Sequence, residues 1–453
     1  MSASPPEGGG GVEDGRRRDG DPSSSRRRSA DMAWPEHFVE AVAAQVAVNA
    51  AASDGRLAAA PAIATFFQVC SAWRAVSQSE MLWQDITCRI WRRQRRLAAS
   101  WQIEFARLHC TGRNFRSRRS AHSLLLPATS PLLACCCLAL SDRHLAAGFL
   151  DGNVRLFDIP NGDAGPIATY HSHPEGDRLG RFSQTVSGLL FLSGPDRLVF
   201  ACKDGNIHVA DIEHPISGSS RRACVGNLVE DGTLVDFTGN DRWWVGLFAG
   251  VPGRSWHVWD VATEELMYVG GALTDPDAVL GWHMLTDLDG PIVARARMAA
   301  PGHVVGCTSS KIQVMDINDP GDVVNELELV RGCIVDSMDG CEGLAVAVDW
   351  FGTAKVYSVP ELEEVGWFNV SRRADQDQGQ HRDLVRKVGC MNWGYAIVCC
   401  YGRIRVYDVM EGKFLYSFME RIGEVRVMAV NDRFVAAWSN ETGLHLWDFQ
   451  TLQ

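Results

Sequence analysis

The stretch LAAGFLDGNVRLFDI (residues 145–159) contains an apolar run, an Asp-Gly turn and a second run that ends in an aromatic residue and Asp. Variants of this pattern return six times: RLVFACKDGNIHVADI (197–212), RWWVGLFAGVPGRSWHVWDV (242–261), HVVGCTSSKIQVMDI (303–317), GLAVAVDWFGTAKVYSV (343–359), YAIVCCYGRIRVYDV (395–409) and RFVAAWSNETGLHLWDF (433–449). The position of the final Asp recurs every 40 to 56 residues. Repeats of this length, each with two visible strands, predict the blades of a β-propeller.

Two further strands are expected in most repeats. Asp151-Gly152 and Asp204-Gly205 indicate hairpins, because such turns need a residue with positive φ. Alternating apolar residues predict outer strands at 166–170, 266–269, 323–329, 364–369 and 413–418. They predict inner strands at 184–192, 234–238, 332–337, 387–392 and 425–430, and one within 280–299.

The last repeat ends in LHLWDFQTLQ at residue 453 and leaves no residues for a fourth strand of the seventh blade. A blade without that strand would expose a sheet edge. We expect the apolar stretch 122–126, just before the first blade, to supply it. The sequence therefore predicts a seven-bladed propeller over 121–453 that is closed by an N-terminal strand.

The part before the propeller has a different composition. Residues 1–31 are rich in Gly, Ser, Pro and Arg and predict a disordered leader. Apolar residues at helical spacing then predict a small helical domain over 32–91, followed by a basic linker helix over 92–120. The third helical stripe is expected to continue through Arg92–Arg96 towards Leu108.

Composition excludes several classes of protein. Residues 1–120 hold 18 Lys and Arg against 12 Asp and Glu, and the rest hold 26 against 43, which gives net charges of +6 and −17. An acidic propeller argues against nucleic acid as its main ligand and favours a basic partner surface. The 14 cysteines lie mostly in apolar strands, without a CxxC pair or a secretory leader, and predict free thiols in a reducing compartment. The most apolar stretch, 124–140, is broken by two prolines and is too short to span a bilayer, so we expect a soluble intracellular protein.

The helical segment carries WPEHFVEAV (34–42) and VCSAWRAVSQSEMLWQDI (69–86). The Val-Cys-x-x-Trp-Arg pattern, with Leu-Trp nine residues after its Trp, resembles the second half of an F-box. The first half departs from that family, with Trp34 in place of Leu before the proline and an insertion near 49–60. The resemblance implies binding to a Skp-type linker protein, with the candidate contact residues Pro35, Phe38, Val69, Trp73, Leu82 and Trp83. For each of these residues the alternative is a place in the core of the helical domain.

The repeats resemble divergent WD repeats, with true Trp-Asp pairs only at Trp259-Asp260 and Trp447-Asp448. Together with the Arg-rich leader, the F-box-like segment and RLHCTGRNFRSRR (107–119), they resemble the plant STERILE APETALA family over nearly the whole chain. That resemblance implies a nuclear, non-catalytic F-box subunit of a cullin-based ubiquitin ligase. It would direct transcriptional repressors to degradation and so promote flower and organ growth. The alternative is a nuclear transcriptional regulator or scaffold that acts through the propeller without ligase activity.

In a propeller, the turns between second and third strands lie on the same face as the connections between blades. The longest connections, 171–183, 270–291 and 371–384, belong to that face, and insertions on one face often mark a binding site. We expect substrate contacts from its exposed aromatic and basic residues. The candidates are Lys203, Arg254, Trp350, Phe351, Tyr401 and Arg403, the alternative for the three aromatic residues being packing within their own blades.

The basic run of Arg92, Arg93, Arg95 and Arg96 is a candidate nuclear import signal, as is 113–119. The alternatives are nucleic-acid contacts or a solvated helix face. Direct nucleic-acid binding is disfavoured because no helix-turn-helix or zinc spacing is present. The sequence holds no HExxH, nucleophile elbow or phosphate-binding loop, so no catalytic residue, metal or cofactor is expected.

Overall fold

The structure, a computed structural model, describes residues 34–128, 133–159, 165–172, 184–193, 196–212, 220–271, 273, 295–308, 311–319, 321, 323–329, 335–370 and 386–450. The predicted leader and most of the three long connections lie outside these residues. The chain divides into two compact units, Met1–His109 and Cys110–Gln453. The division therefore falls within helix α5 (Trp101–Arg116) rather than at the predicted domain boundaries.

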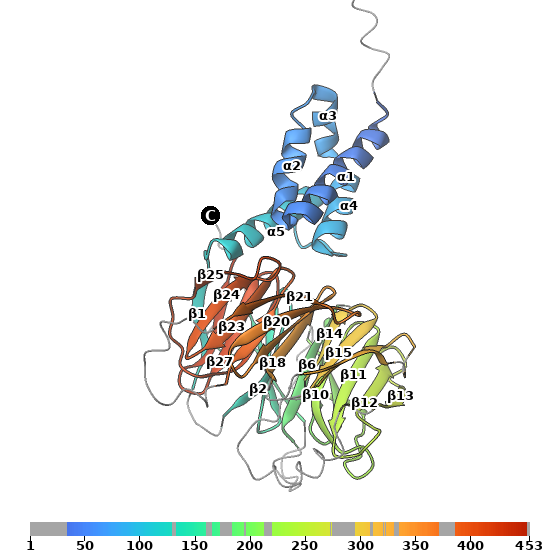
Figure 1. The fold of residues 1–453 in the computed structure, drawn as a ribbon, viewed down its shortest axis with the longest axis vertical. Coiled ribbons are helices and arrows are strands. Elements are labelled where there is room, and N and C mark those ends of the chain that lie inside the picture. The colour runs from blue at the N-terminus through green and yellow to red at the C-terminus, as the bar shows by residue number, and fades with distance from the viewer. Residues whose placement is uncertain are drawn as a thin grey trace, which may run out of the picture. The chain divides into compact units, whose positions relative to one another are not determined.

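The first unit is helical (Figure 1). Besides the start of α5 it contains α1 (Glu36–Asp54), η1 (Arg56–Ala58), α2 (Ala59–Phe66), α3 (Ser71–Ala75), η2 (Val76–Gln78) and α4 (Glu80–Trp91). Three buried alanines of α1, Ala43, Ala44 and Ala47, let α2 and α4 approach it closely. The predicted stripe of α4 is confirmed, because Leu82, Trp83, Ile86, Ile90 and Trp91 are all buried.

The helix α4 ends earlier than the sequence predicts. It stops at Trp91, Arg92 adopts a left-handed conformation with φ 55°, and helix returns only at Trp101. Four arginines within five residues would repel one another at helical spacing. The loop is fixed instead by Glu80, whose Oε2 accepts hydrogen bonds from the Trp101 backbone N–H at 2.9 Å and from Arg96 Nη1 at 3.4 Å.

The second unit consists of seven four-stranded antiparallel sheets (Figure 1). The first four are β2 (Cys135–Leu140), β3 (His144–Phe149), β4 (Asn153–Asp158) and β5 (Ala168–His171); β6 (Val186–Ser193), β7 (Asp196–Cys202), β8 (Ile207–Asp211) and β9 (Arg221–Cys224); β10 (Thr233–Gly239), β11 (Trp243–Ala249), β12 (Trp256–Asp260) and β13 (Leu266–Gly270); and β14 (Arg295–Ala300), β15 (His303–Cys307), β16 (Lys311–Asp316) and β17 (Val323–Glu328). The last three are β18 (Val335–Cys341), β19 (Leu344–Asp349), β20 (Thr353–Ser358) and β21 (Glu364–Asn369); β22 (Val388–Met391), β23 (Tyr395–Cys400), β24 (Arg403–Asp408) and β25 (Lys413–Ser417); and β26 (Val425–Val430), β27 (Phe434–Ser439), β28 (Gly443–Asp448) and β1 (Ala121–Pro127).

The sheets form a closed ring. Each inner strand contacts the inner strand of the next blade, in the order β2, β6, β10, β14, β18, β22 and β26, and β26 contacts β2 again. The predicted seven-bladed propeller is therefore confirmed. The inner strand expected somewhere within 280–299 is β14, and β9 is an outer strand that the apolar pattern did not predict.

The predicted N-terminal closure is also confirmed. Strand β1 pairs antiparallel with β28, with Ala121 opposite Asp448 and Pro127 opposite Gly443. Leu125 is buried in a cluster that includes Phe149, Phe434 and Trp438. Because β1 covers the outer edge of β28, that strand is paired on both sides and is not an exposed sheet edge.

Turn residues set the ends of the strands. The predicted Asp-Gly hairpins are confirmed, with φ of 81° at Gly152 and 84° at Gly205. Asparagines recur between first and second strands: Asn392 Nδ2 donates to the Asn431 carbonyl at 3.2 Å, and Asn431 Nδ2 donates to the Ser141 carbonyl at 3.0 Å. Each of these amides therefore joins one blade to the next.

The thirteen cysteines in the described part of the chain form no disulfide with one another. Those in the strands are mostly buried, as the sequence predicts, and burial raises the pKa of Cys307 to about 12. Such thiols are small apolar core residues, with little reactive thiolate near neutral pH.

Candidate interaction surfaces

The helical unit exposes apolar side chains that its own core does not use. Phe38 is 44% exposed and Val69 62% exposed, and Trp34 stacks on Phe38 with ring centroids 4.8 Å apart. Pro35 sits at the N-cap of α1 and is exposed. Met81, at the start of α4, is also exposed. Of the six predicted linker-binding residues, Pro35, Phe38 and Val69 are therefore accessible to a partner.

The other three predicted residues support the helical unit from inside or from its edge. Leu82 and Trp83 are buried, and Trp83 Nε1 donates to the Ser77 carbonyl at 2.7 Å. Trp73 is half-buried and stacks on Phe66 at 4.3 Å. Leu82 and Trp83 are thus core residues, which is the alternative left open by the sequence.

The arginines of the predicted import signal lie in the loop after α4 rather than on a helix. Arg92, Arg95 and Arg96 are exposed and Arg93 is half-buried. Arg96 forms an exposed ion pair with Glu80 at 3.4 Å, a type of contact that contributes little to stability.

We define the entry face of the propeller as the face on which each inner strand begins. Because the blades are antiparallel, the turns between second and third strands lie on the same face. Five of the six predicted substrate residues lie in these turns and Arg403 directly follows one, so they share a face, and their contact with a substrate stays a prediction. They lie in or next to the β7–β8, β11–β12, β19–β20 and β23–β24 turns: Lys203, Arg254, Trp350, Phe351, Tyr401 and Arg403.

These six residues differ in accessibility. Phe351 is 69% exposed and Tyr401 40% exposed, and Arg403 is exposed as well. Arg254 is held by Asp231, with Nη2 2.6 Å and Nε 3.1 Å from Oδ1. Trp350 is half-buried, and its ring lies 5.9 Å from Lys387 Nζ. The contacts of Arg254 and Trp350 are thus to residues outside the predicted set.

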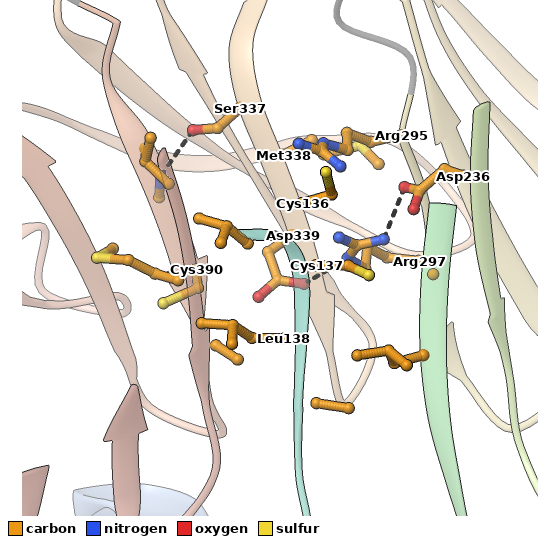
Figure 2. Close-up of a pocket in the computed structure, with 18 of the residues that line it drawn as sticks. Cys136, Cys137, Leu138, Asp236, Arg295, Arg297, Ser337, Met338, Asp339 and Cys390 are labelled. Carbon is orange, nitrogen blue, oxygen red and sulfur yellow. Dashed lines mark hydrogen bonds and ion pairs between the residues drawn. The ribbon is translucent and has the colours of Figure 1, made fainter. Parts of the chain in front are cut away.

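A cavity of ≈220 Å³ occupies the channel enclosed by the inner strands (Figure 2). All seven inner strands contribute to its lining. Its ionisable lining residues include four arginines, Arg295, Arg297, Arg386 and Arg426, and two carboxylates, Asp236 and Asp339. The lining is therefore positively charged within a propeller whose net charge is strongly negative.

One of these arginines is neutralised by the protein. Figure 2 shows Arg297 between the two carboxylates, with Nη1 2.7 Å from Asp236 Oδ2 and Nε 3.3 Å from Asp339 Oδ1. Asp236 Oδ2 also accepts from the Ala296 N–H at 2.9 Å, and Asp339 Oδ2 from the Met391 N–H at 2.9 Å. Burial would lower the pKa of Arg297, but the two carboxylates raise it. These contacts join four consecutive inner strands. The cluster around Arg297 therefore has a structural role.

The other three arginines have no such partner. Within the part of the chain that the structure describes, the guanidinium groups of Arg295, Arg386 and Arg426 make no hydrogen bond or ion pair with a carboxylate. Sequence reasoning missed them because they lie within two residues of the first residue of β14, β22 or β26, where no apolar period marks them. Their recurrence at the start of inner strands was the available signal.

Among the described helices, none is both long and apolar enough to cross a membrane. No group of three or more His, Cys, Asp or Glu side chains in the described residues is placed to hold a metal ion.

These features define a WD-type β-propeller protein with an additional N-terminal helical unit. No protein-family model matches the sequence. The chain is 44% identical over 436 residues to the Transcriptional regulator STERILE APETALA of Arabidopsis thaliana, an alignment that covers 94% of each chain. The chain therefore belongs to the STERILE APETALA family, which confirms the predicted family.

Solved structures with similarity to the chain include the WD40 β-propeller domain of Doa1, at 10% identity and a TM-score of 0.49 over 72% of this chain and 97% of that chain. A computationally designed protein, Ika8, matches at 17% identity and a TM-score of 0.46 over 72% of this chain and 99% of that chain.

Proposed function

We propose that this protein is the non-catalytic substrate receptor of a cullin-based ubiquitin ligase. The helical unit would bind a Skp-type linker, and the propeller would hold nuclear repressor proteins for degradation in the control of flower and organ growth. The receptor contributes positioning, which raises the local concentration of substrate near the ubiquitin-carrying enzyme.

The observation that carries the proposal is the excess of exposed apolar side chains on the helical unit. Its core is already filled by Ala43, Ile63, Leu82, Trp83 and Ile86, yet Trp34, Phe38, Val69 and Met81 remain in solvent. In Figure 1 the start of α1 and helix α3 lie towards the same end of this unit. Exposed apolar and aromatic groups of this kind favour a protein partner.

The test is co-purification of the full chain with a Skp-type linker and a cullin. A Phe38→Ser, Val69→Ser double variant should lose the linker, because both side chains are exposed and their replacement leaves the core intact. Met267→Ser changes an exposed apolar residue of β13 in the propeller and serves as the matched control. Failure of the wild-type chain to retain the linker would refute the proposal.

A second candidate function is transcriptional regulation through the propeller without ligase activity. It is favoured by the name of the Arabidopsis relative, which describes a transcriptional regulator. Both functions require nuclear localisation, for which we propose the loop with Arg92, Arg93, Arg95 and Arg96 as the import signal. A chain that enters the nucleus and alters transcription but binds no linker would support this second function.

A further inference from the structure

The starts of several inner strands are bulged, and one of these bulges brings a charged side chain, Arg426, to the channel. The pairing of first and second strands skips one residue at the same place in five blades, between 135 and 137, 186 and 188, 234 and 236, 335 and 337, and 425 and 427. A residue skipped in this way is turned out of the regular alternation of the strand. Two of the skipped residues, Cys136 and Arg426, line the cavity.

Arg295 and Arg386 lie at the same end of the channel, at the starts of two inner strands that are separated by β18. Arg295 is the first residue of β14, and Arg386 lies two residues before β22. Burial and the positive charges of Arg295 and Arg426 together lower the pKa of Arg386 to about 10, against the opposing effects of Asp336 and Glu424. The three guanidinium groups are therefore close enough to repel one another and still charged at neutral pH.

Nearby carboxylates do not relieve this repulsion by direct pairing. Asp336 Oδ2 accepts a hydrogen bond from the Lys387 backbone N–H at 3.1 Å and lies 3.8 Å from Lys387 Nζ, so its charge is shared with that lysine. Glu424 acts on Arg386 only through longer-range attraction. Arg386 Nε is buried, and it has no hydrogen-bond partner among the residues that the structure describes. Leaving a buried donor unsatisfied destabilises the folded state, and an anionic ligand that accepts from it would remove this cost.

The entry face, on which this end of the channel lies, also carries exposed apolar side chains. Phe351 and Tyr401 lie in entry-face turns, and Val225, Leu228 and Val229 are exposed in the connection from β9 to β10 on the same face. A cavity of ≈220 Å³ has the volume of several water molecules, each of which occupies about 30 Å³ in the liquid. The cavity can therefore admit one side chain from a peptide segment that lies across the entry face.

We propose that the entry-face end of the channel binds a phosphorylated serine or threonine on an extended, partly apolar segment of a partner protein, with Arg295, Arg386 and Arg426 contacting the phosphate. A phosphate carries close to two negative charges and three acceptor oxygens, which match three clustered guanidinium groups better than one carboxylate does. Under the proposed function, on which this inference rests, the bound segment is the degradation signal of the substrate.

The experiment measures binding of the full chain to fluorescent peptide pools that are identical except for a fixed central residue, phosphoserine, Glu or Ser. We expect the phosphoserine pool to bind most tightly. An Arg386→Gln, Arg426→Gln double variant should weaken that binding by about tenfold or more. Arg222→Gln changes an exposed arginine of the outer strand β9 and should leave binding unchanged.

Equal binding of the phosphoserine and Ser pools, or binding that the double variant leaves unchanged, would overturn the proposal. Equal binding of the Glu pool would overturn the preference for phosphate. If inorganic phosphate competes as strongly as the peptide, the site binds an adventitious ion only. Should the double variant unfold, raising the salt concentration must weaken the phosphoserine complex of the wild-type chain and not the Ser complex.

The same double variant separates this inference from the proposed function. Its substitutions lie in the propeller and not in the helical unit, so co-purification with the Skp-type linker should persist. Loss of phosphopeptide binding with linker binding retained supports both ideas. Phosphopeptide binding by a chain that never binds the linker would support the site and refute the ligase.

Discussion

The carboxylate of Glu104 organises the start of α5. It is fully buried and accepts hydrogen bonds from the backbone N–H groups of Leu97 at 3.2 Å and Ala98 at 3.0 Å, as well as from Arg107. Burial alone would raise the pKa of Glu104, but Arg107 and the two backbone donors together lower it below its ordinary value of 4.5. This side chain therefore ties the loop after α4 to α5.

We predict that Glu104→Gln destabilises the helical unit by about 1–3 kcal/mol, because a buried charge-assisted network loses its acceptor. The lowered pKa means that the ionised carboxylate stabilises the fold above pH 4.5 and that this contribution is lost as the pH falls towards the folded-state pKa. Thermal unfolding followed by circular dichroism, at neutral pH and near pH 4, measures both effects.

The exposed Glu36 in the first turn of α1 provides the control, since Glu36→Gln removes a carboxylate without removing a buried contact. If Glu104→Gln and wild type lost the same stability on acidification, the assigned role of Glu104 would be wrong.

Single residues also show where sequence reasoning reached its limit. The Val-Cys-x-x-Trp-Arg and Leu-Trp pattern located the helical unit, but spacing alone could not separate the buried Leu82 from the exposed Val69. The cluster of channel arginines was not predicted, for a different reason. They are far apart in the sequence and meet only because the ring closes.

At the scale of elements, β1 holds the ends of the propeller together. Leu125 and Leu124 are neighbours on this strand, yet Leu125 is buried in the core of the closing blade and Leu124 is largely exposed. The two residues therefore offer a matched pair for measuring what closure contributes.

We predict that Leu125→Ala destabilises the propeller by about 2–5 kcal/mol, because it leaves a cavity beside Phe149 and Trp438. Leu124→Ala should change stability by less than about 0.5 kcal/mol. Urea unfolding followed by tryptophan fluorescence compares them. Similar losses in the two variants would mean that β1 does not pack as the structure shows.

Elements with a strong apolar period were predicted well. The second and third strands, the Asp-Gly turns and the closing strand β1 all follow from alternation and turn chemistry. Strand β9 was missed because its sequence, RRAC, is mostly polar on an exposed outer edge. The end of α4 was missed because the apolar pattern of this helix continues in the sequence towards α5. Repulsion among the arginines between the two helices outweighs that pattern.

At the scale of the molecule, the division between the two units falls inside α5, whose residues from Cys110 onward belong to the propeller unit. Phe115 stacks on Tyr395 at 4.9 Å and lies 4.3 Å from Phe449, and its carbonyl accepts a hydrogen bond from Tyr416 at 2.6 Å. Asn114 Nδ2 donates to the Phe449 carbonyl at 3.0 Å. The C-terminal part of α5 is therefore part of the propeller fold.

This placement predicts where the chain can be shortened. A fragment of residues 110–453 keeps these contacts and β1, and should unfold in a cooperative thermal transition. A fragment of residues 128–453 loses both and should aggregate or melt far lower, because the edge of β28 is uncovered. Light scattering and calorimetry distinguish the two fragments. A stable, monomeric 128–453 fragment would show that closure by β1 is dispensable.

The pairing of β1 with β28 also dictates the order of events during synthesis. Pro127 and Gly443, which face each other in the finished blade, are made 316 residues apart. At about 5–20 residues per second, β1 is synthesised between about 15 s and one minute before its partner strand. Throughout that interval the nascent chain carries an unmatched strand, which a chaperone or another polypeptide can reach. In a chain whose synthesis ends prematurely, β1 would stay unpaired. The unpaired strand is then a feature by which protein quality control can recognise an incomplete chain.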